Sequence, residues 1–273
     1  MSYEREIVAW QEKRATGLRK EDSWLTLVNL AWLNEGENRV GSDPAGEVTL
    51  PKGKAPAVAG SIFLQKGTLR LEAKPGAGIT ANGAAVTSMA LVTDEAEEPT
   101  ILKLGSLTSH VIKRGDRFAL RVKDSEAETR KNFKGLQYFP VDSKWRVEAR
   151  FEPYTPVKQI PIANIIGTTE NQPSPGALVF DIDGTSYRLD PIAEEGSDEL
   201  FVIFADKTSG RETYGAGRYL YTPKPVDGRV VLDFNKAYNP PCAFTDFATC
   251  PLPPKQNKLA LRVDAGEKKY GNH

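Results

Sequence analysis

The sequence is poor in the residues that build metal centres and disulfide frameworks. It contains two cysteines and two histidines among 273 residues. A structural zinc site uses four such ligands, commonly with closely spaced cysteines. His110 lies far from both cysteines in the sequence, and His273 is the last residue. We therefore predict no metal site and no cofactor. A chain of this length buries enough surface to fold without either kind of cross-link.

An excess of charge of either sign is also missing. Lysine and arginine together number 36, as do aspartate and glutamate, so the formal net charge is zero at pH 7. Proteins that bind nucleic acids non-specifically carry a basic excess, because phosphate contacts supply most of that affinity. The balanced composition therefore predicts that nucleic acid is not a partner of this protein.

Long apolar runs are absent as well. No segment approaches the roughly 20 consecutive apolar residues that a membrane-spanning helix needs. The first six residues, MSYERE, lack the cationic start and apolar core of a secretory signal. These features predict that the membrane is not a partner and that the protein is cytoplasmic. In that compartment the two cysteines would be thiols.

Alternation of apolar and polar residues dominates most of the chain. It is clear over residues 117–123 and 145–151, whereas residues 200–205 form a continuous apolar run typical of a strand buried on both faces. The Asn-Gly pair at 82–83 and the Asp-Gly pair at 183–184 are typical of tight hairpin turns. Many short strands joined by such turns, with little helix, predict a mainly β fold.

The beginning of the chain does not follow this alternation. A helix is predicted over residues 3–18, because Ile7, Trp10 and Arg14 lie at helical spacing and Gly17 can end it. Residues 23–33 form a dense apolar run that fits a second short helix or a strand. Together these features indicate an N-terminal helical segment.

Four regions are predicted along the chain. The N-terminal helical segment covers residues 1–40, and a β-sandwich covers residues 41–124. Residues 125–143 break the alternation with charged residues, glycine and proline, and are interpreted as a connector. Residues 144–273 form a second antiparallel β unit, either a sandwich or a barrel.

Motifs in the first β region are similar to those of forkhead-associated domains. They are ENRVGSDP at residues 37–44, the Asn-Gly pair at 82–83 and LKLG at 102–105. The resemblance implies a β-sandwich, and active members of that family bind phosphothreonine peptides. Here Gly41-Ser42 stands where the family has Gly-Arg, and no Ser-x-x-His occurs near residues 57–63. The donors for a phosphate are therefore missing, and the resemblance implies the fold without phosphopeptide binding.

A second set of motifs lies near the C-terminus. The motifs are DKTSGR at 206–211, TYGAGR at 213–218, DFNKAYNPPC at 233–242, CPLPP at 250–254 and AGEK at 265–268. Through them the whole chain resembles a prokaryotic family catalogued as a domain of unknown function. That resemblance implies no reaction.

The same motifs combine polar side chains with stiff, proline-rich backbone. Arginine presents a planar fork of donors that suits a carboxylate or a phosphate, and proline fixes the backbone around it. We predict that the C-terminal β unit binds a small anionic or hydrogen-bond-rich ligand. The predicted ligand-binding residues are Arg211, Tyr214, Arg218, Asn235, Tyr238, Asn239 and Cys242. An equally weighted alternative is that the two arginines belong to a buried network of ion pairs.

Whether the protein is an enzyme stays open at this point. The candidates for catalysis are Asp233, Glu267 and Cys242. A carboxylate would need burial to hold a proton near neutral pH. Cys242 and Cys250 lie eight positions apart and fit a disulfide, a nucleophile with a resolving partner, or two packed thiols, of which the last is favoured. The alternative function is an interaction protein whose forkhead-associated-like unit binds a protein partner.

Overall fold

The computed structural model describes residues 2–271, which form two compact units. The sandwich unit is Leu18–Phe133, and the C-terminal unit combines residues 134–271 with residues 2–17. The predicted helical segment 1–40 is thus shared between the units. Its helix α1 (Tyr3–Leu18) lies almost wholly in the C-terminal unit, whereas residues 27–41 form two strands of the sandwich unit.

The sandwich unit consists of two sheets and two short helices. One sheet has the order β1-β11-β10-β9-β6-β7 and the other has the order β3-β2-β4-β5-β8. All neighbouring strands are antiparallel except the pair β2 and β3. The bounds are η1 Trp24–Thr26, β1 Leu27–Trp32, β2 Gly36–Gly41, β3 Val48–Thr49, β4 Gly60–Gln65, β5 Thr68–Ala73, β6 Thr80–Ala81, β7 Ala84–Ala85, β8 Ser88–Ala90, β9 Leu102–Leu104, β10 Leu107–Arg114, β11 Arg117–Asp124 and α2 Glu128–Lys131.

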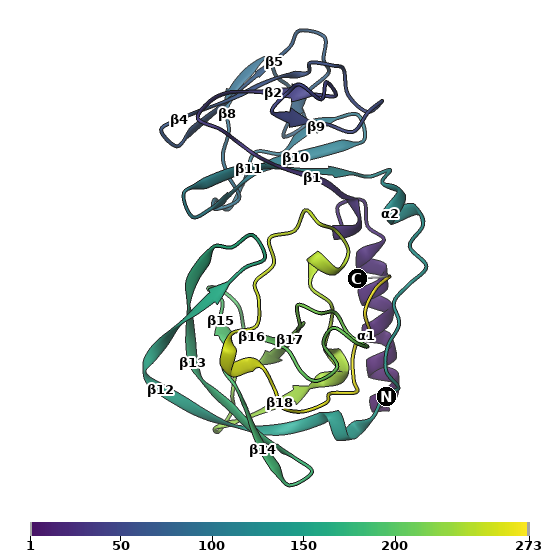
Figure 1. The fold of residues 1–273 in the computed structure, drawn as a ribbon, viewed down its shortest axis with the longest axis vertical. Coiled ribbons are helices and arrows are strands. Elements are labelled where there is room, and N and C mark those ends of the chain that lie inside the picture. Colours follow the sequence, from purple (N-terminus) through teal and green to yellow (C-terminus); the bar gives the residue numbers. More distant parts are fainter. Residues whose placement is uncertain (1, 272–273) are drawn as a thin grey trace. The chain divides into compact units, whose positions relative to one another are not determined.

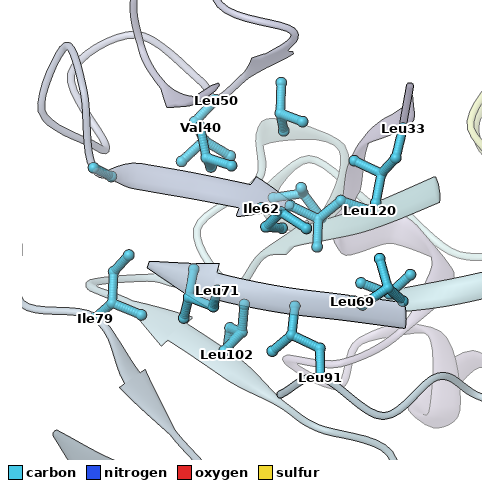
Figure 2. Packing of buried hydrophobic residues seen from close by; sticks show 14 of the residues in the cluster. Leu33, Val40, Leu50, Ile62, Leu69, Leu71, Ile79, Leu91, Leu102 and Leu120 are labelled. Carbon is cyan, nitrogen blue, oxygen red and sulfur yellow. The ribbon is translucent and has the colours of Figure 1, made fainter. Parts of the chain in front are cut away.

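The core of the sandwich unit follows from the alternation in its strands. Ile62 of β4, Leu71 of β5 and Leu120 of β11 are buried, and Figure 2 shows them among the side chains gathered between the strands. The turn between β6 and β7 contains Asn82 and Gly83 with φ of 47° and 86°, the positive values that a tight hairpin of this kind requires.

The C-terminal unit consists of helix α1, two antiparallel sheets and a long, mostly irregular tail formed by residues 234–271. The sheets have the orders β14-β13-β12-β18 and β15-β16-β17, and β12 and β13 form the long curved hairpin of Figure 1. The bounds are η2 Ser143–Trp145, β12 Arg146–Ala163, β13 Thr169–Ile182, β14 Thr185–Leu189, β15 Ile192–Ala193, β16 Glu199–Phe204, β17 Arg218–Pro223, β18 Arg229–Asp233, η3 Phe234–Lys236, η4 Pro241–Ala243 and η5 Lys255–Asn257.

Two apolar clusters hold the C-terminal unit together. The first is centred on aromatic rings: Phe234 packs against Trp145, Phe180 and Phe204 with ring centroids 5.5–6.4 Å apart. The second, called here the thiol cluster, surrounds both cysteines. Its buried members are Ile160, Ile162, Ile192, Phe201, Ile203, Tyr219, Cys242, Ala248 and Cys250.

The prediction of a mainly β fold with an N-terminal helix is confirmed. The apolar run at 200–205 largely coincides with β16, of which only the first residue is exposed. Within residues 2–271, no helix combines the length and the apolar character needed to cross a membrane.

The packing of the sandwich core predicts a large effect for Ile62→Ala. The substitution removes a completely buried side chain, so we expect the free energy of unfolding of the sandwich unit to fall by about 2–5 kcal/mol. Val92→Ala, whose side chain is 45% exposed, is the control and should change it by less than about 0.5 kcal/mol. Urea titrations of both variants measure the difference. Equal effects would contradict the described core.

Candidate functional site

Arg218, the first residue of β17, is completely buried and lies at the centre of a hydrogen-bonded network. Its Nη2 donates to Oδ1 of Asp206 over 3.2 Å and to the carbonyl of Val263 over 3.1 Å, and its Nη1 donates to the carbonyl of Ala265. The second oxygen of Asp206 accepts the backbone N–H of Val263 at 2.8 Å. The ion pair therefore fastens the C-terminal tail to the loop before β17.

Asp233 and Asn235 form a second polar group, which makes hydrogen bonds with the start of helix α1. The hydroxyl of Tyr3 donates to Oδ1 of Asp233 over 2.8 Å, and Nδ2 of Asn235 donates to the Tyr3 oxygen over 2.8 Å. The same Nδ2 donates to the carbonyl of Asp142. Burial is the main cause that raises the pKa of Tyr3, and the Asp233 carboxylate raises it further. Oδ1 of Asp233 is thus engaged, whereas its buried Oδ2 has no hydrogen-bond partner.

A third group is centred on Glu267, whose carboxylate is completely buried. Its Oε1 accepts Nε of Arg14 at 3.0 Å, and its Oε2 accepts the backbone N–H of Asn239 at 2.8 Å. Nη2 of Arg14 donates to the carbonyl of Asn239 over 3.0 Å. The guanidinium lies 4.7 Å from the centre of the Tyr238 ring, a cation–π distance. Arg14 and Glu267 are therefore held in one fixed arrangement.

The backbone beside Glu267 brings this carboxylate close to residues 237–239. Gly266 has φ of 76°, and a Cβ on it would lie 2.4 Å from the carbonyl oxygen of Ala237. Only glycine fits this position without displacing backbone. Burial raises the pKa of Glu267, and the neighbouring Arg14 guanidinium and Asn239 N–H oppose that effect.

Two polar atoms next to this group lack a hydrogen-bond partner. They are Oδ1 of Asn239 and the hydroxyl oxygen of Tyr138, and both are buried. The Glu267 carboxylate lies close to the Tyr138 phenol and, after burial, raises its pKa, so Asn239 is the less satisfied of the two. Nδ2 of Asn239 donates to the carbonyl of Lys268 over 2.8 Å. This contact identifies the nitrogen of the side-chain amide, so the unpaired atom is its oxygen. An unpaired buried polar atom costs about 1–3 kcal/mol, so such atoms mark positions where a partner would be stabilising.

The predicted ligand-binding residues are therefore divided among several environments. Tyr238 and Asn239 lie at the Arg14–Glu267 pair, whereas the hydroxyl of Tyr214 donates to the carbonyl of Cys242 over 3.1 Å in the thiol cluster. Arg211 is exposed in the turn after Thr208. Among residues 2–271, no group of three or more His, Cys, Asp or Glu side chains is arranged as metal ligands.

Two residues of the group around Glu267 are absent from the predicted set. Arg14 and Tyr138 come from outside the C-terminal motifs. The sequence did carry a signal for Arg14, because it shares helical spacing with Ile7 and Trp10. A charged residue on the apolar face of a helix requires a partner when that face is buried. Tyr138 lies in the connector and has no comparable signal.

In the sandwich unit, the side chains in the forkhead-associated-like motifs have internal partners. The Ser42 hydroxyl donates to the carbonyl of Ala55 over 2.9 Å, and Oδ1 of Asn82 accepts the N–H of Ile101 at 2.9 Å. Arg39 pairs with Glu47 over 3.2 Å. These contacts stabilise the loops of the sandwich.

The chain is thus a mainly β protein in which Arg14 of helix α1 is held by Glu267 of the C-terminal tail. Residues 131–268, about half of the chain, match the family described as "Protein of unknown function (DUF1684)". The chain belongs to this family, which confirms the predicted membership in a family of unknown function. None of the curated proteins matches the sequence.

Two solved structures are similar to parts of this chain. The solution NMR structure of an uncharacterized protein of Haloarcula marismortui is 38% identical, covering 54% of this chain and 82% of its own length, with a TM-score of 0.45. A structure from an analysis of phosphothreonine-dependent FHA domain interactions is 20% identical. It covers 36% of this chain and 96% of its own length, with a TM-score of 0.25.

The buried network predicts that Arg218→Ala is strongly destabilising. The substitution removes the only cation that pairs with the buried Asp206 carboxylate among residues 2–271 and the guanidinium donor of the tail carbonyls, so we expect the free energy of unfolding of the C-terminal unit to fall by about 3–5 kcal/mol. The exposed Arg211 provides the matched control, and Arg211→Ala should cost less than about 0.5 kcal/mol. Thermal and urea unfolding would measure both. If Arg218→Ala is as stable as Arg211→Ala, the ion pair does not support the tail.

Proposed function

We propose that the C-terminal unit binds a small organic anion through Arg14. The observation that supports this proposal is the arrangement of Arg14 itself. Its guanidinium is fixed by Glu267 and Asn239, while 21% of its side chain remains exposed to solvent. Binding is the proposed function of the site, and Arg14 is its contact residue.

The Arg14 guanidinium retains donor capacity for a ligand. Within residues 2–271, its hydrogen bonds to protein acceptors use Nε and Nη2 and leave Nη1 for a ligand. A guanidinium held on two sides and over the Tyr238 ring has already lost most of its rotational freedom. A ligand that binds it therefore avoids much of the usual cost of ordering a long side chain. A carboxylate or phosphate suits its donors best.

The unpaired atoms beside Arg14 indicate what else the ligand carries. Oδ1 of Asn239 can only accept a hydrogen bond, and the Tyr138 hydroxyl can donate or accept. Because Oδ1 of Asn239 is buried, a hydroxyl or amino group next to the anionic group of the ligand would have to enter between the side chains to satisfy Asn239 while the anion binds Arg14. This pattern favours small hydroxy or amino acids over simple monocarboxylates.

Glu267 acts as a positioning residue in this proposal. Both of its carboxylate oxygens are engaged, one by Arg14 and one by the backbone of Asn239. Its charge offsets that of the guanidinium, and its position fixes which edge of Arg14 faces outward. Asp233 is engaged by Tyr3 and Asn235 and has no part in the proposed contact.

The proposal predicts selective loss of binding in Arg14→Met. Acetate, lactate, serine and inorganic phosphate serve as probes, and calorimetric titration measures their dissociation constants. We expect lactate or serine to bind more tightly than acetate. Loss of a charge-assisted hydrogen bond, worth about 1.5–3 kcal/mol, should weaken binding about 10- to 100-fold in Arg14→Met.

Arg5→Met is the matched control, because Arg5 is an exposed arginine on the same helix. It should bind the probes as the unchanged protein does. Equal affinities in the Arg14 and Arg5 variants, with both folded by circular dichroism, would contradict the proposal. So would the absence of binding of every probe to the unchanged protein.

A further inference from the structure

The two cysteines are neighbours in the thiol cluster. Both are free and almost completely buried, with 5% and 4% of Cys242 and Cys250 exposed. The backbone N–H of Cys242 donates to the sulfur of Cys250, with 3.1 Å between nitrogen and sulfur. This contact places the Cys250 sulfur directly against the residue that carries the other thiol.

The backbone on either side of the pair is stiff. Cys242 lies in η4, which follows Pro240 and begins at Pro241. Cys250 precedes Pro251, whose backbone forms a bridge with Asn164 of the region after β12. Because proline fixes φ, both thiols are presented by segments with few alternative conformations.

A tyrosine lies beside each cysteine. The hydroxyl of Tyr214 donates to the carbonyl of Cys242 over 3.1 Å, and that of Tyr219 donates to the carbonyl of Pro251 over 2.8 Å. Burial is the main cause that raises the pKa of both phenols, and the neighbouring cysteines raise it further. The tyrosines therefore remain protonated and act as donors at the pair.

The two sulfurs differ in their tendency to ionise. A hydrogen bond from the Cys250 thiol lowers the pKa of Cys242, and Tyr214 acts in the same direction. The interaction with the Cys242 thiol and burial raise the pKa of Cys250, and the backbone N–H of Cys242, which donates to its sulfur, opposes them. A thiolate is the reactive form of cysteine, so Cys242 suits the role of nucleophile and Cys250 that of a protonated partner.

We propose that Cys242 and Cys250 are a dithiol pair that reacts with hydrogen peroxide and closes to an intramolecular disulfide. The Cys242 thiol loses its proton, its sulfur attacks one peroxide oxygen, and the O–O bond breaks. The leaving hydroxide takes the proton that Cys242 lost and forms water. Cys242 is then a sulfenic acid. The sulfur of Cys250 loses its proton and attacks that of Cys242. The S–O bond breaks, and the hydroxyl group leaves with this proton as a second water.

Burial of the pair selects the oxidant. Both thiols are about 95% buried, so a small, uncharged oxidant such as hydrogen peroxide meets the least obstruction in approaching them. A bulky disulfide such as oxidised glutathione must contact the attacking sulfur in line with its S–S bond, which the side chains of the thiol cluster obstruct. The site therefore favours small peroxide-type oxidants over bulky disulfides. Its cysteines make no contact with Arg14 in the proposed function, although Tyr238 packs against both the thiol cluster and the Arg14 guanidinium.

The test uses the whole protein, treated with hydrogen peroxide under native conditions. We expect the two free thiols to be lost together, the intact mass to fall by two hydrogens, and reductant to restore both. Peptide mapping should identify a Cys242–Cys250 disulfide. Retention of both thiols, oxidation to sulfinic acid without a disulfide, or a mixed disulfide formed equally fast with oxidised glutathione would overturn the proposal.

Two single variants separate the roles of the cysteines. Cys250→Ser should stop at the sulfenic acid of Cys242, which dimedone traps, whereas Cys242→Ser should lose the reaction with peroxide. Equal labelling of both variants would overturn the assignment of the nucleophile. Tyr214→Phe, which leaves both thiols in place, should slow disulfide formation several-fold. If a cysteine variant does not fold, peptide mapping of the unchanged protein still decides whether the disulfide forms.

Discussion

The buried ion pair between Arg218 and Asp206 is the constraint on which the C-terminal unit depends. It holds the carbonyls of Val263 and Ala265 against the start of β17, and Glu267 follows two residues later. The position of Glu267 then fixes Arg14, so a link within the β unit determines where a side chain of the N-terminal helix points. Removing one partner of such a pair is costly because the other charge stays buried.

The polar side chains around Glu267 are of two kinds, those that serve the fold and those that keep an atom without a partner. Asp206, Arg218 and Glu267 use their charged atoms in internal contacts and serve the fold. Asn239 and Tyr138 keep unpaired atoms at the same location. Natural proteins accept such a local cost chiefly where a ligand or reaction requires it. Nε of Arg218 is unpaired as well, but Arg218 is completely buried, whereas 21% of the Arg14 side chain is exposed, which is why the proposed contact lies at Arg14.

The thiol cluster combines close packing with the proposed reactivity of its two cysteines. Cys242 and Cys250 contribute to an apolar cluster in which aromatic rings dominate, with Phe201 and Tyr219 at 4.9 Å between ring centroids. The prediction of packed thiols describes their burial. What the packing adds is the contact between the two residues, in which the thiol of Cys250 lowers the pKa of Cys242.

Local patterns in the sequence determined the mainly β fold, the first helix and its inward face, because alternation and helical spacing reflect burial directly. They determined that strand β16 is buried and that Asn82-Gly83 turns a hairpin. Which polar residues meet was decided only by the tertiary structure. Arg14 and Glu267 lie 253 positions apart, and Tyr3 reaches Asp233 across 230. No local pattern encodes such pairs, because the contact exists only after the tail has packed against the helix.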